Sequence, residues 1–455
     1  MIVSDAFRGK RYAVLGLARS GLATVRSLVE SGAEVVAWDG KEEARDELIR
    51  HAELVSASMP LSQSSGHNEA WTLKQVQGDG LFKLADPLEI DLTGFDGIVV
   101  SPGVPINRHP IADKARAENV QLIGDIELFA QARPSLPPHK VVGITGTNGK
   151  STTTALIHHI LKSAGIPTMM GGNIGLPILA QDPLPAGGVY VLELSSYQID
   201  LTHSLDCDIA VLTNITPDHL DRYDGFADYA ASKERLFTLQ HVDKQAVIAT
   251  EDDRCRMIAS RINHRLTRVS SKTVGDQSLW PSLQGPHNAQ NVACASAVAK
   301  ALGVEADATL AALRSFRGLP HRMECVRTLN DVLYVNDSKA TNATATAPAL
   351  AAYPAIHWIL GGQAKSDELD ECAPHYGHVR AAYTIGEAGP MFAKLLAPHM
   401  PVTESGTLDR AVSDAHRAAK PGETVLLSPA CASFDQFRDF EARGDAFRAA
   451  VEALS

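Results

Sequence analysis

The sequence lacks several features that would point to an unusual protein class. Its six cysteines are widely scattered with no CxxC pair, which argues against a disulfide framework, a redox pair or a zinc site. No stretch approaches the ~20 consecutive apolar residues of a membrane helix. The first residues contain no apolar signal-peptide core. We therefore expect a cytoplasmic protein with reduced thiols and no membrane insertion.

The chain also lacks an excess of basic residues. Lys and Arg number 42 against 53 Asp and Glu, so the formal net charge is −11. This acidity argues against a chain-wide nucleic-acid surface. Hydrophobic residues at 45% and charged residues at 21% are ordinary globular values. The length of 455 residues suggests about three domains at ~150 residues each.

Short apolar runs alternate with helical patterns along most of the chain, which predicts an α/β fold with mainly parallel sheets. The helical patterns include Ser20–Ser31 and Thr153–Ser163. The expected strands are Tyr12–Gly16, Glu34–Trp38, Gly97–Val100, Val141–Ile144, Val189–Leu194, Ile209–Thr213, Val332–Asn336, His357–Leu360 and Thr424–Leu427.

Three segments break this pattern. The three prolines of Arg133–His139 indicate a linker, and Arg317–Pro320 indicates a second boundary. Ser56–Gly80 is rich in Ser, Gln and Gly and lacks periodicity. We predict that it is a surface insertion without chemistry of its own.

A phosphate-binding loop is the most informative motif. The expected strand Val141–Ile144 runs into Gly146–Gly149, and Lys150-Ser151-Thr152 then opens a helix. Such glycines let backbone N–H groups surround phosphate oxygens at a helix N-terminus. Lys150 would pair with the β- and γ-phosphates, and Ser151 would bind magnesium. The alternative is an ordinary Gly-rich turn, because Ile144 stands where the standard motif has its first Gly.

Two further side chains are candidates for the same chemistry. Glu193 ends the expected strand Val189–Leu194, and open α/β sheets bind ligands at the carboxyl ends of their strands. His219 follows the expected strand Ile209–Thr213. Spacing alone leaves a structural role open for both residues.

Ten stretches together resemble the Mur ligases, the ATP-dependent amide-forming enzymes of bacterial cell-wall synthesis. They occur in family order and cover nearly the whole chain. They are GTNGKST (146–152), GGNIG (171–175), LELSSYQ (192–198), NITPDHLDRY (214–223), YAASKERLF (229–237), GPHNAQN (285–291), GLPHRME (318–324), NDSKATN (336–342), GGQAKS (361–366) and LLSPACASFDQF (426–437).

Within the family, the chain looks most like the member that adds D-glutamate to UDP-N-acetylmuramoyl-L-alanine. The resemblance implies a monomer with three domains: a Rossmann-like N-terminal domain (residues 1–132, with the insertion), a central P-loop ATPase-like domain (133–317) and a Rossmann-like C-terminal domain (318–455). These would bind the UDP-sugar, ATP and the amino acid respectively. The implied products are the amide, ADP and phosphate.

The resemblance also implies the nucleotide and metal site. Lys150, His219 and Lys233 would be catalytic, and Lys233 matches a lysine that relatives carry as an N-carboxylated side chain. Two magnesium ions would be held by Ser151, Glu193, His219 and Lys233. The ATP site would comprise Gly146, Thr147, Asn148, Gly149, Lys150, Ser151, Thr152, Asn288, Asn291, His321, Arg322, Asp337 and Lys339.

The remaining predicted residues would contact the other two substrates. The nucleotide sugar would meet Arg19, Ser20, Asp39, Lys41, Gly103, Asn173 and Ser195. D-Glutamate would meet Thr341, Lys365, Ser433 and Phe440. For Ser433 the residues themselves add an argument, because Ser433 and Gln436 have the spacing of a capping box and predict a helix N-terminus there.

Two other function classes explain part of the chain. Gly16–Gly21 is an incomplete GxGxxG motif, since Ala18 replaces the middle glycine, and Asp39 follows at a distance that suggests NAD. An NAD(P) oxidoreductase would leave the phosphate loop unexplained. A non-catalytic P-loop switch would need neither His219 nor Lys233.

Overall fold

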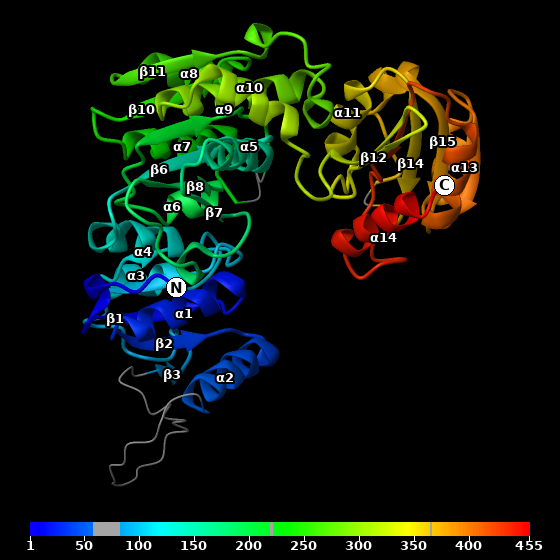
Figure 1. Ribbon diagram of the computed structural model, residues 1–455. Coiled ribbons are helices and arrows are strands. Elements are labelled where there is room, and N and C mark those ends of the chain that lie inside the picture. Colours follow the sequence, from blue (N-terminus) through cyan, green and yellow to red (C-terminus); the bar gives the residue numbers. More distant parts are fainter. Residues whose placement is uncertain (58–81, 219–221, 365) are drawn as a thin grey trace. The chain divides into compact units, whose positions relative to one another are not determined.

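The structure is a computed structural model that describes residues 1–57, 82–218, 222–364 and 366–455. These residues form three β-sheets (Figure 1). They also form two compact units: Met1–Lys150 with Leu161–Val269, and Ser151–Ile160 with Ser270–Ser455. Most of the predicted insertion, residues 58–80, lies outside the described residues.

The first sheet is parallel, with the strand order β3-β2-β1-β4-β5. Its strands are β1 (Arg11–Leu15), β2 (Glu34–Trp38), β3 (Phe82–Leu84), β4 (Gly97–Val100) and β5 (Leu122–Ile123). The accompanying helices are α1 (Arg19–Glu30), α2 (Glu42–Ala57), α3 (Ile111–Ala117) and α4 (Asp125–Ala132). The turn between β1 and α1 therefore lies at the carboxyl edge of the sheet, where such folds bind ligands.

The second sheet is also parallel, with the order β11-β10-β9-β6-β8-β7. Its strands are β6 (His139–Thr145), β7 (Thr168–Gly172), β8 (Gly188–Glu193), β9 (Ile209–Leu212), β10 (Gln245–Ala249) and β11 (Arg265–Val269). Its helices are α5 (Lys150–Ser163), α6 (Ser196–Asp200), α7 (Phe226–Thr238) and α8 (Asp253–Arg261). The central strands β6, β8 and β9 are almost wholly buried, as parallel strands covered on both faces must be.

The first and second sheets share one hydrophobic core, which includes Val14 and Tyr190. Helix α4 adds polar contacts between them. The Glu127 carboxylate accepts hydrogen bonds from the backbone N–H groups of His203 and Ser204, at 2.7 and 2.8 Å. The two sheets of the first unit are thus joined by packing and by hydrogen bonds.

The third sheet has the order β12-β13-β17-β14-β15-β16 and is parallel apart from β12. Its strands are β12 (Glu324–Leu329), β13 (Val332–Asn336), β14 (Ile356–Gly361), β15 (Val379–Ile385), β16 (Val402–Gly406) and β17 (Thr424–Leu427). The helices of this unit are α9 (Pro286–Ala301), α10 (Ala306–Ser315), α11 (Ala343–Ala352), α12 (Gly389–Leu396), α13 (Leu408–Ala418) and α14 (Phe440–Glu452). In α13 the residues Leu408, Ala411, Val412 and Ala415 are buried, which is the spacing of one helix face.

The expected α/β fold with mainly parallel sheets is confirmed. Four expected strands have the observed bounds, and the other five differ by one or two residues at an end. The helix that Lys150-Ser151-Thr152 was predicted to open is α5, which begins at Lys150 and ends at Ser163 as expected. Five of the six cysteines are buried and none forms a disulfide.

The helix predicted to start at Ser433 is wrong. Residues 433–438 form turns, in which the N–H groups of Gln436 and Phe437 donate to the Ser433 carbonyl at 3.1 and 2.8 Å. The helix begins at Phe440 instead, where the Asp439 side chain accepts a hydrogen bond from the Ala442 N–H at 2.7 Å. The local capping pattern at Ser433 does not start a helix, and the cap at Asp439 does.

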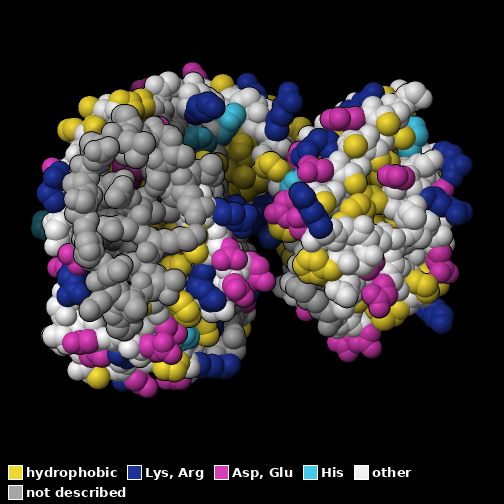
Figure 2. Space-filling view, turned by 90° about the horizontal axis from the view of Figure 1, so that it is seen from below, with side chains coloured by type: hydrophobic (Ala, Val, Ile, Leu, Met, Phe, Trp, Pro, Cys, Tyr) yellow, Lys and Arg dark blue, Asp and Glu magenta, His cyan; other side chains and the backbone are white. Residues whose placement is uncertain are grey.

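Over the described ranges, no helix is both long and apolar enough to cross a membrane. Figure 2 shows acidic and basic side chains interspersed over the visible face. The negative net charge is therefore distributed on this face and does not form a single-sign surface there.

Candidate active site

The phosphate loop is built on the carboxyl end of β6 and held from the side by the segment after β9. Gly146 has φ +148°, and a Cβ there would lie 2.0 Å from the Thr213 Oγ1 atom. The Asn148 N–H donates to the Asn214 side-chain oxygen at 2.9 Å, and the Thr147 N–H donates to the Asn214 carbonyl at 2.8 Å. Glycine is required at position 146 because the two segments approach so closely.

Two lysines meet at one carbonyl of this loop. The Lys150 Nζ atom donates to the carbonyls of Gly146 at 3.0 Å and Thr147 at 2.8 Å. The Lys233 Nζ atom, from α7, donates to the same Gly146 carbonyl at 2.9 Å. The two predicted catalytic lysines are thus brought together, and their charges converge on the loop that would surround phosphate.

Lys233 is buried, with a side chain that is 1% exposed, and its Nζ atom lies 4.4 Å from the centre of the Tyr229 ring. Burial, followed by the nearby charge of Lys150, lowers the pKa of Lys233 to about 7. A surface lysine would be a cation at neutral pH, whereas this amine is neutral in a large fraction of molecules. A neutral amine is a nucleophile.

Glu193 ends β8, the strand that pairs with β6 so that Glu193 lies opposite Ile144. Its side chain is buried, and the Oε1 atom accepts a hydrogen bond from the Asn173 side chain at 2.9 Å. The Oε2 atom is buried and has no hydrogen-bond partner among the residues that the structure describes. A buried carboxylate oxygen with no partner is costly unless it binds a ligand.

This arrangement fits a magnesium ion. Magnesium prefers oxygen ligands, and proteins commonly supply one or two carboxylates while water and substrate phosphates complete the octahedron. In the part of the chain that the structure describes, no cluster of three or more His, Cys, Asp or Glu side chains could hold a metal. Glu193 and the Ser151 hydroxyl, which is buried at the second position of α5, are the donors that would suit such an ion.

Ser195 has a structural task. It is the N-cap of α6, and its Oγ atom accepts a hydrogen bond from the Gln198 N–H at 3.3 Å. The Gln198 Oε1 atom in turn accepts from the Ser195 N–H at 3.1 Å, which completes a capping box. This box holds the start of α6 directly after Glu193.

Two predicted site residues, His219 and Lys365, lie outside the described residues. Their predicted roles are therefore not tested by the geometry.

The turn between β1 and α1 has the close packing of a phosphate-binding turn. A Cβ at Gly21 would lie 1.9 Å from the Gly16 carbonyl oxygen, so only glycine fits there. The Asp39 carboxylate accepts hydrogen bonds from the Leu17 N–H at 2.7 Å and the Lys41 N–H at 2.9 Å. Arg19 and Ser20 begin α1 at the same edge of the sheet. Asp39 thus connects the turn after β1 with the turn after β2, and both turns carry predicted nucleotide-sugar contacts.

The first turns of α5 and α9 meet within the second unit. The Thr153 hydroxyl donates to the Asn291 side-chain oxygen at 3.2 Å, and the Asn291 amide donates to Asn288 at 3.1 Å. Asn288 also donates to the Gln284 carbonyl at 3.0 Å. Both asparagines are buried. The chain of hydrogen bonds places them beside the helix that the phosphate loop opens.

His321 and Asp337 lie together near the carboxyl end of β13. The His321 Nδ1 atom forms a hydrogen bond with the Asn336 side-chain nitrogen at 3.1 Å. The Lys339 N–H donates to the His321 carbonyl at 3.0 Å. Asp337 accepts hydrogen bonds from the Ser428 hydroxyl at 2.8 Å and the Met323 N–H at 3.2 Å. Burial raises the pKa of Asp337 to about 7.

The predicted amino-acid contacts adjoin these nucleotide candidates. The Lys339 Nζ atom lies 3.8 Å from the centre of the Phe440 ring, and His321 packs edge-on against the same ring at 6.1 Å. Ser433 is buried. Arg322 and Thr341 are half-buried, so their side chains reach solvent. The structure thus gathers His321, Lys339 and Phe440 at one edge of the third sheet.

Sequence reasoning missed Arg443, which organises this edge. Its side chain is 1% exposed, and its guanidinium donates to the carbonyls of Ser338 at 2.9 Å, Cys431 at 3.0 Å and Ala432 at 3.2 Å. Burial lowers the pKa of Arg443 to about 10. A single arginine on an amphipathic helix looks like a surface residue, and no local pattern distinguishes it.

Asn214 and Tyr229 were also missed. Asn214 lies two residues beyond the end of β9, close to the carboxyl edge of the sheet where Glu193 ends β8. Tyr229 shares a 3.1 Å hydrogen bond with the Thr147 hydroxyl of the phosphate loop. The strand-end position could have identified Asn214, whereas Tyr229 is recognisable only from the tertiary contact.

Comparisons with known proteins agree with this arrangement. Residues 144–281 match the family model of the Mur ligase middle domain, and residues 321–431 match that of the Mur ligase, glutamate ligase domain. Among solved structures, a UDP-N-acetylmuramate–alanine ligase of Thermotoga maritima has a TM-score of 0.54 at 15% identity and covers 98% of this chain and 99% of its own. That likeness concerns the fold alone.

Curated relatives are much more similar in sequence. The UDP-N-acetylmuramoylalanine–D-glutamate ligase of Novosphingobium aromaticivorans is 61% identical, over 100% of this chain and 97% of the relative. The enzymes of the same name from Sphingopyxis alaskensis and Zymomonas mobilis are 61% and 56% identical, each over the full length of both chains. The chain therefore belongs to the Mur ligase family.

Proposed function

We propose that the chain is an ATP-dependent ligase that joins D-glutamate to UDP-N-acetylmuramoyl-L-alanine in the synthesis of peptidoglycan precursors. The products are the amide, ADP and phosphate. The observation that carries the proposal is the pairing of β6 and β8, which brings the phosphate loop beside Glu193. The relatives of the same name, identical at 56–61% of positions, support the choice of substrates.

The chemistry explains why ATP is needed. A carboxylate does not react with an amine at neutral pH, because its oxygen is a poor leaving group. In the first step the alanyl carboxylate oxygen attacks the γ-phosphorus, the bond to the bridging oxygen of ADP breaks, and an acyl phosphate forms. In the second step the amine of D-glutamate attacks the acyl carbon. The tetrahedral intermediate expels phosphate, and the nitrogen loses a proton.

Lys150 acts on the first step. Its ammonium group lies within the phosphate loop and stabilises negative charge on the transferring phosphoryl group. The loop N–H groups orient the same oxygens. We propose two magnesium ions, which would supply positive charge to the phosphate oxygens when bound. Glu193 and Ser151 would hold one ion, and His219 and Lys233 would contribute to the other.

Lys233 takes part as a carbamate. Its lowered pKa of about 7 leaves the amine neutral often enough to add carbon dioxide. The nitrogen forms a bond to the carbon of carbon dioxide and loses a proton, and the resulting carbamate carries its negative charge on the two oxygens. That anion is a suitable oxygen donor to magnesium, which an ammonium group is not.

The three sheets divide the substrates. Residues 1–132 bind the UDP-sugar with Arg19, Ser20, Asp39, Lys41 and Gly103, to which Asn173 and Ser195 are added from the central domain. Residues 133–317 bind ATP. Residues 318–455 bind D-glutamate with Thr341, Lys365, Ser433 and Phe440, and they complete the nucleotide site with His321, Arg322, Asp337 and Lys339. The enzyme is a monomer of the cytoplasm, where its nucleotide-linked substrates are available.

The test is an assay of phosphate release from ATP with both substrates present. Release should require the nucleotide sugar together with D-glutamate, and L-glutamate should support much less. Release that ignores the acceptor amine would contradict the ligase and favour a simple ATPase.

Lys150→Ala should lower kcat by about 10²–10³-fold, since it removes the cation closest to the transferring charge. Lys162→Ala is the matched control, because Lys162 is exposed in the last turn of the same helix. Both variants should retain the wild-type unfolding temperature. Equal activity of Lys150→Ala and wild type would refute the assignment of the phosphate loop.

A further inference from the structure

The turn after β4 lies against the turn that opens α1. The Val104 N–H donates to the Ser101 carbonyl at 3.0 Å, which closes a turn around Pro102 and Gly103. The Ser101 hydroxyl donates to the Gly16 carbonyl at 2.8 Å. The two turns are therefore adjacent at the carboxyl edge of the first sheet. The segment Ser101–Ile106 is called the β4 loop below.

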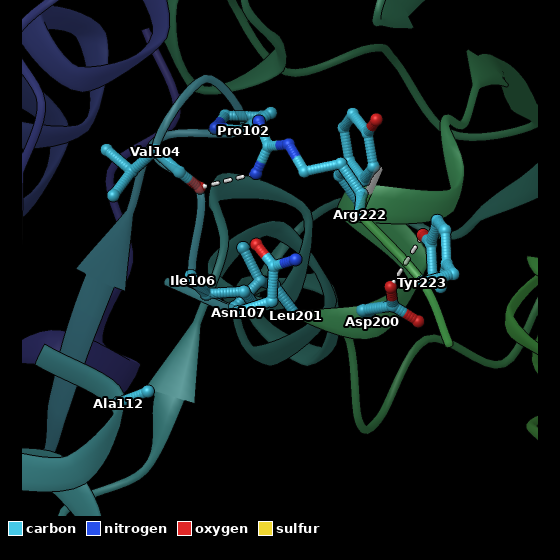
Figure 3. A pocket seen from close by; sticks show the side chains of 10 residues that line it. Pro102, Val104, Ile106, Asn107, Ala112, Asp200, Leu201, Arg222 and Tyr223 are labelled. Carbon is cyan, nitrogen blue, oxygen red and sulfur yellow. Dashed lines mark hydrogen bonds between the residues drawn. The ribbon is translucent and has the colours of Figure 1, made fainter. Parts of the chain in front are cut away.

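A pocket borders this loop on one side. It has a volume of about 240 Å³ and lies between the β4 loop and helix α6. Its walls include Val104, Ile106 and Leu201 (Figure 3). Tyr197 also lines it. Hydrogen bonds that reach across this pocket can hold the loop in place.

Arg222 supplies such an interaction from the second sheet of the same unit. Its NH1 atom donates to the Val104 carbonyl at 3.1 Å, and its NH2 atom donates to the Gly103 carbonyl at 3.3 Å. Figure 3 shows the side chain reaching across the pocket toward Val104. The planar guanidinium has two donors at a fixed spacing and can bind two successive carbonyls, whereas an ammonium group has no such fork.

The guanidinium of Arg222 packs on a group of tyrosines. The guanidinium carbon lies 4.5 Å from the centre of the Tyr197 ring, and Tyr197 stacks on Tyr223 with ring centres 6.1 Å apart at 16°. The Tyr223 hydroxyl donates to the Asp200 carboxylate at 2.8 Å. Tyr223 also packs edge-on against Tyr229, which is hydrogen-bonded to the phosphate loop. Arg222 is thus held by the elements that carry the ATP site.

From this geometry we propose that Arg222 is a positioning residue, which holds the β4 loop in the conformation that receives the diphosphate of the nucleotide sugar. The inference rests on the proposed function, because Gly103 is assigned there to the nucleotide sugar. Arg222 acts through the loop and touches neither ATP nor the reacting carboxylate. Loss of the fork therefore weakens nucleotide-sugar binding and leaves ATP binding unchanged.

The test compares Arg222→Gln and Arg222→Lys with a matched control, Arg254→Gln. Arg254 is likewise half-buried in the first unit and lies over an aromatic ring, that of Phe226 at 5.1 Å. Steady-state kinetics should give a KM for UDP-N-acetylmuramoyl-L-alanine raised about tenfold in Arg222→Gln, equivalent to about 1.4 kcal/mol. The lysine variant should behave similarly, because it keeps the charge and loses the fork. The KM for ATP and the value of kcat should stay within about twofold of wild type in all three variants.

Calorimetric titration with UDP-N-acetylmuramoyl-L-alanine gives a readout that does not depend on turnover, and thermal unfolding shows that the variants are folded. An unchanged affinity for the nucleotide sugar in folded Arg222→Gln would overturn the proposal. So would an equal rise in the KM of every substrate, or full rescue by Arg222→Lys. Absence of acceptor-dependent phosphate release in the wild-type protein would instead contradict the proposed function, so the two failures are distinguishable.

Discussion

At the scale of single residues, burial changes the chemistry of two ionisable groups. Lys233 and Asp337 are both buried, and in each case desolvation is the largest cause of the pKa shift. The amine becomes easier to deprotonate and the carboxyl becomes harder to ionise. Both shifts favour the neutral form, and each leads to a test around neutral pH.

The neutral form of Lys233 should control its carboxylation. Its pKa of about 7 means that the amine is mostly protonated at about pH 6 and mostly neutral at about pH 8. With ¹³C-labelled bicarbonate, a carbamate signal in the NMR spectrum should be strong at the higher pH and weak at the lower. Lys162→Ala should keep that signal, and Lys233→Ala should lose both the signal and the activity.

Short carboxylic acids such as acetate should restore part of the activity of Lys233→Ala, because they can occupy the space of the missing anion. A Lys233→Ala variant that remains as active as wild type at about pH 8 would exclude the carbamate.

Asp337 should make stability depend on pH in the opposite sense to most carboxylates. Its folded pKa of about 7 exceeds the ordinary aspartate pKa of 3.8, so the folded state binds the proton more tightly. Stability is therefore full at acidic pH and is lost as the pH rises toward and through about 7. Asp337→Asn, which cannot ionise, should be more stable than wild type at about pH 8, by about 1–3 kcal/mol.

The measurement is thermal unfolding of wild type and Asp337→Asn across this pH range. Asp331→Asn is the control, because Asp331 is exposed and directly precedes β13, whereas the buried Asp337 directly follows it. A constant difference between wild type and Asp337→Asn at all pH values would show that folding does not shift the pKa of Asp337.

At the scale of elements, the loops at the carboxyl ends of the third sheet depend on one side chain from α14. Arg443 donates to carbonyls that follow β13, β14 and β17, including Gly361 at 3.4 Å. The backbone there leaves no room for larger residues, since a Cβ at Gly362 would lie 2.3 Å from the Ala432 carbonyl oxygen. The loops are therefore held by hydrogen bonds to a single buried cation.

Arg443→Met should destabilise this sheet strongly. The substitution leaves several buried carbonyls without donors, and it should cost at least about 3 kcal/mol of unfolding free energy. Denaturant unfolding measures the loss. Arg438→Met is the control, because the Arg438 side chain is 83% exposed and pairs only at the surface with Asp439. A loss of less than about 1 kcal/mol in Arg443→Met would mean that water replaces the guanidinium.

At the scale of the whole molecule, an acidic protein is proposed to bind three anionic substrates. The net charge is −11, yet Lys150, Arg322, Lys339 and Lys365 are assigned to bound anions. Magnesium is expected to supply further positive charge only when ATP is bound. In the described chain no cluster of three His, Cys, Asp or Glu side chains could hold a metal by itself.

Removal of divalent metal should therefore stop catalysis and leave the structure intact. Excess EDTA should abolish phosphate release, and added magnesium should restore it. The unfolding temperature should change by less than about 2 °C, since no structural metal is lost. A large fall in the unfolding temperature on EDTA treatment would indicate a structural metal instead.

Much of the fold is determined by the sequence itself. The bounds of β2, β4, β13 and β17 follow from short buried runs flanked by turn residues. The phosphate loop is equally local, because a strand, a glycine turn and a helix occupy consecutive residues. The ten motifs identified the family because each of them is also a run of consecutive residues.

Only the tertiary structure decided which side chains bind which distant backbone carbonyls. Arg222 and Gly103 are separated by 119 residues, Lys233 and Gly146 by 87, and Arg443 and Ser338 by 105. Ser433 shows the converse, since a local capping pattern did not produce a helix against the turn that follows β17. Local preferences are worth about 1 kcal/mol, whereas burial of a charged group and its partners involves several. The sequence by itself determined the elements and the family, and long-range packing decided the hydrogen bonds, the burial and the pKa values of the site.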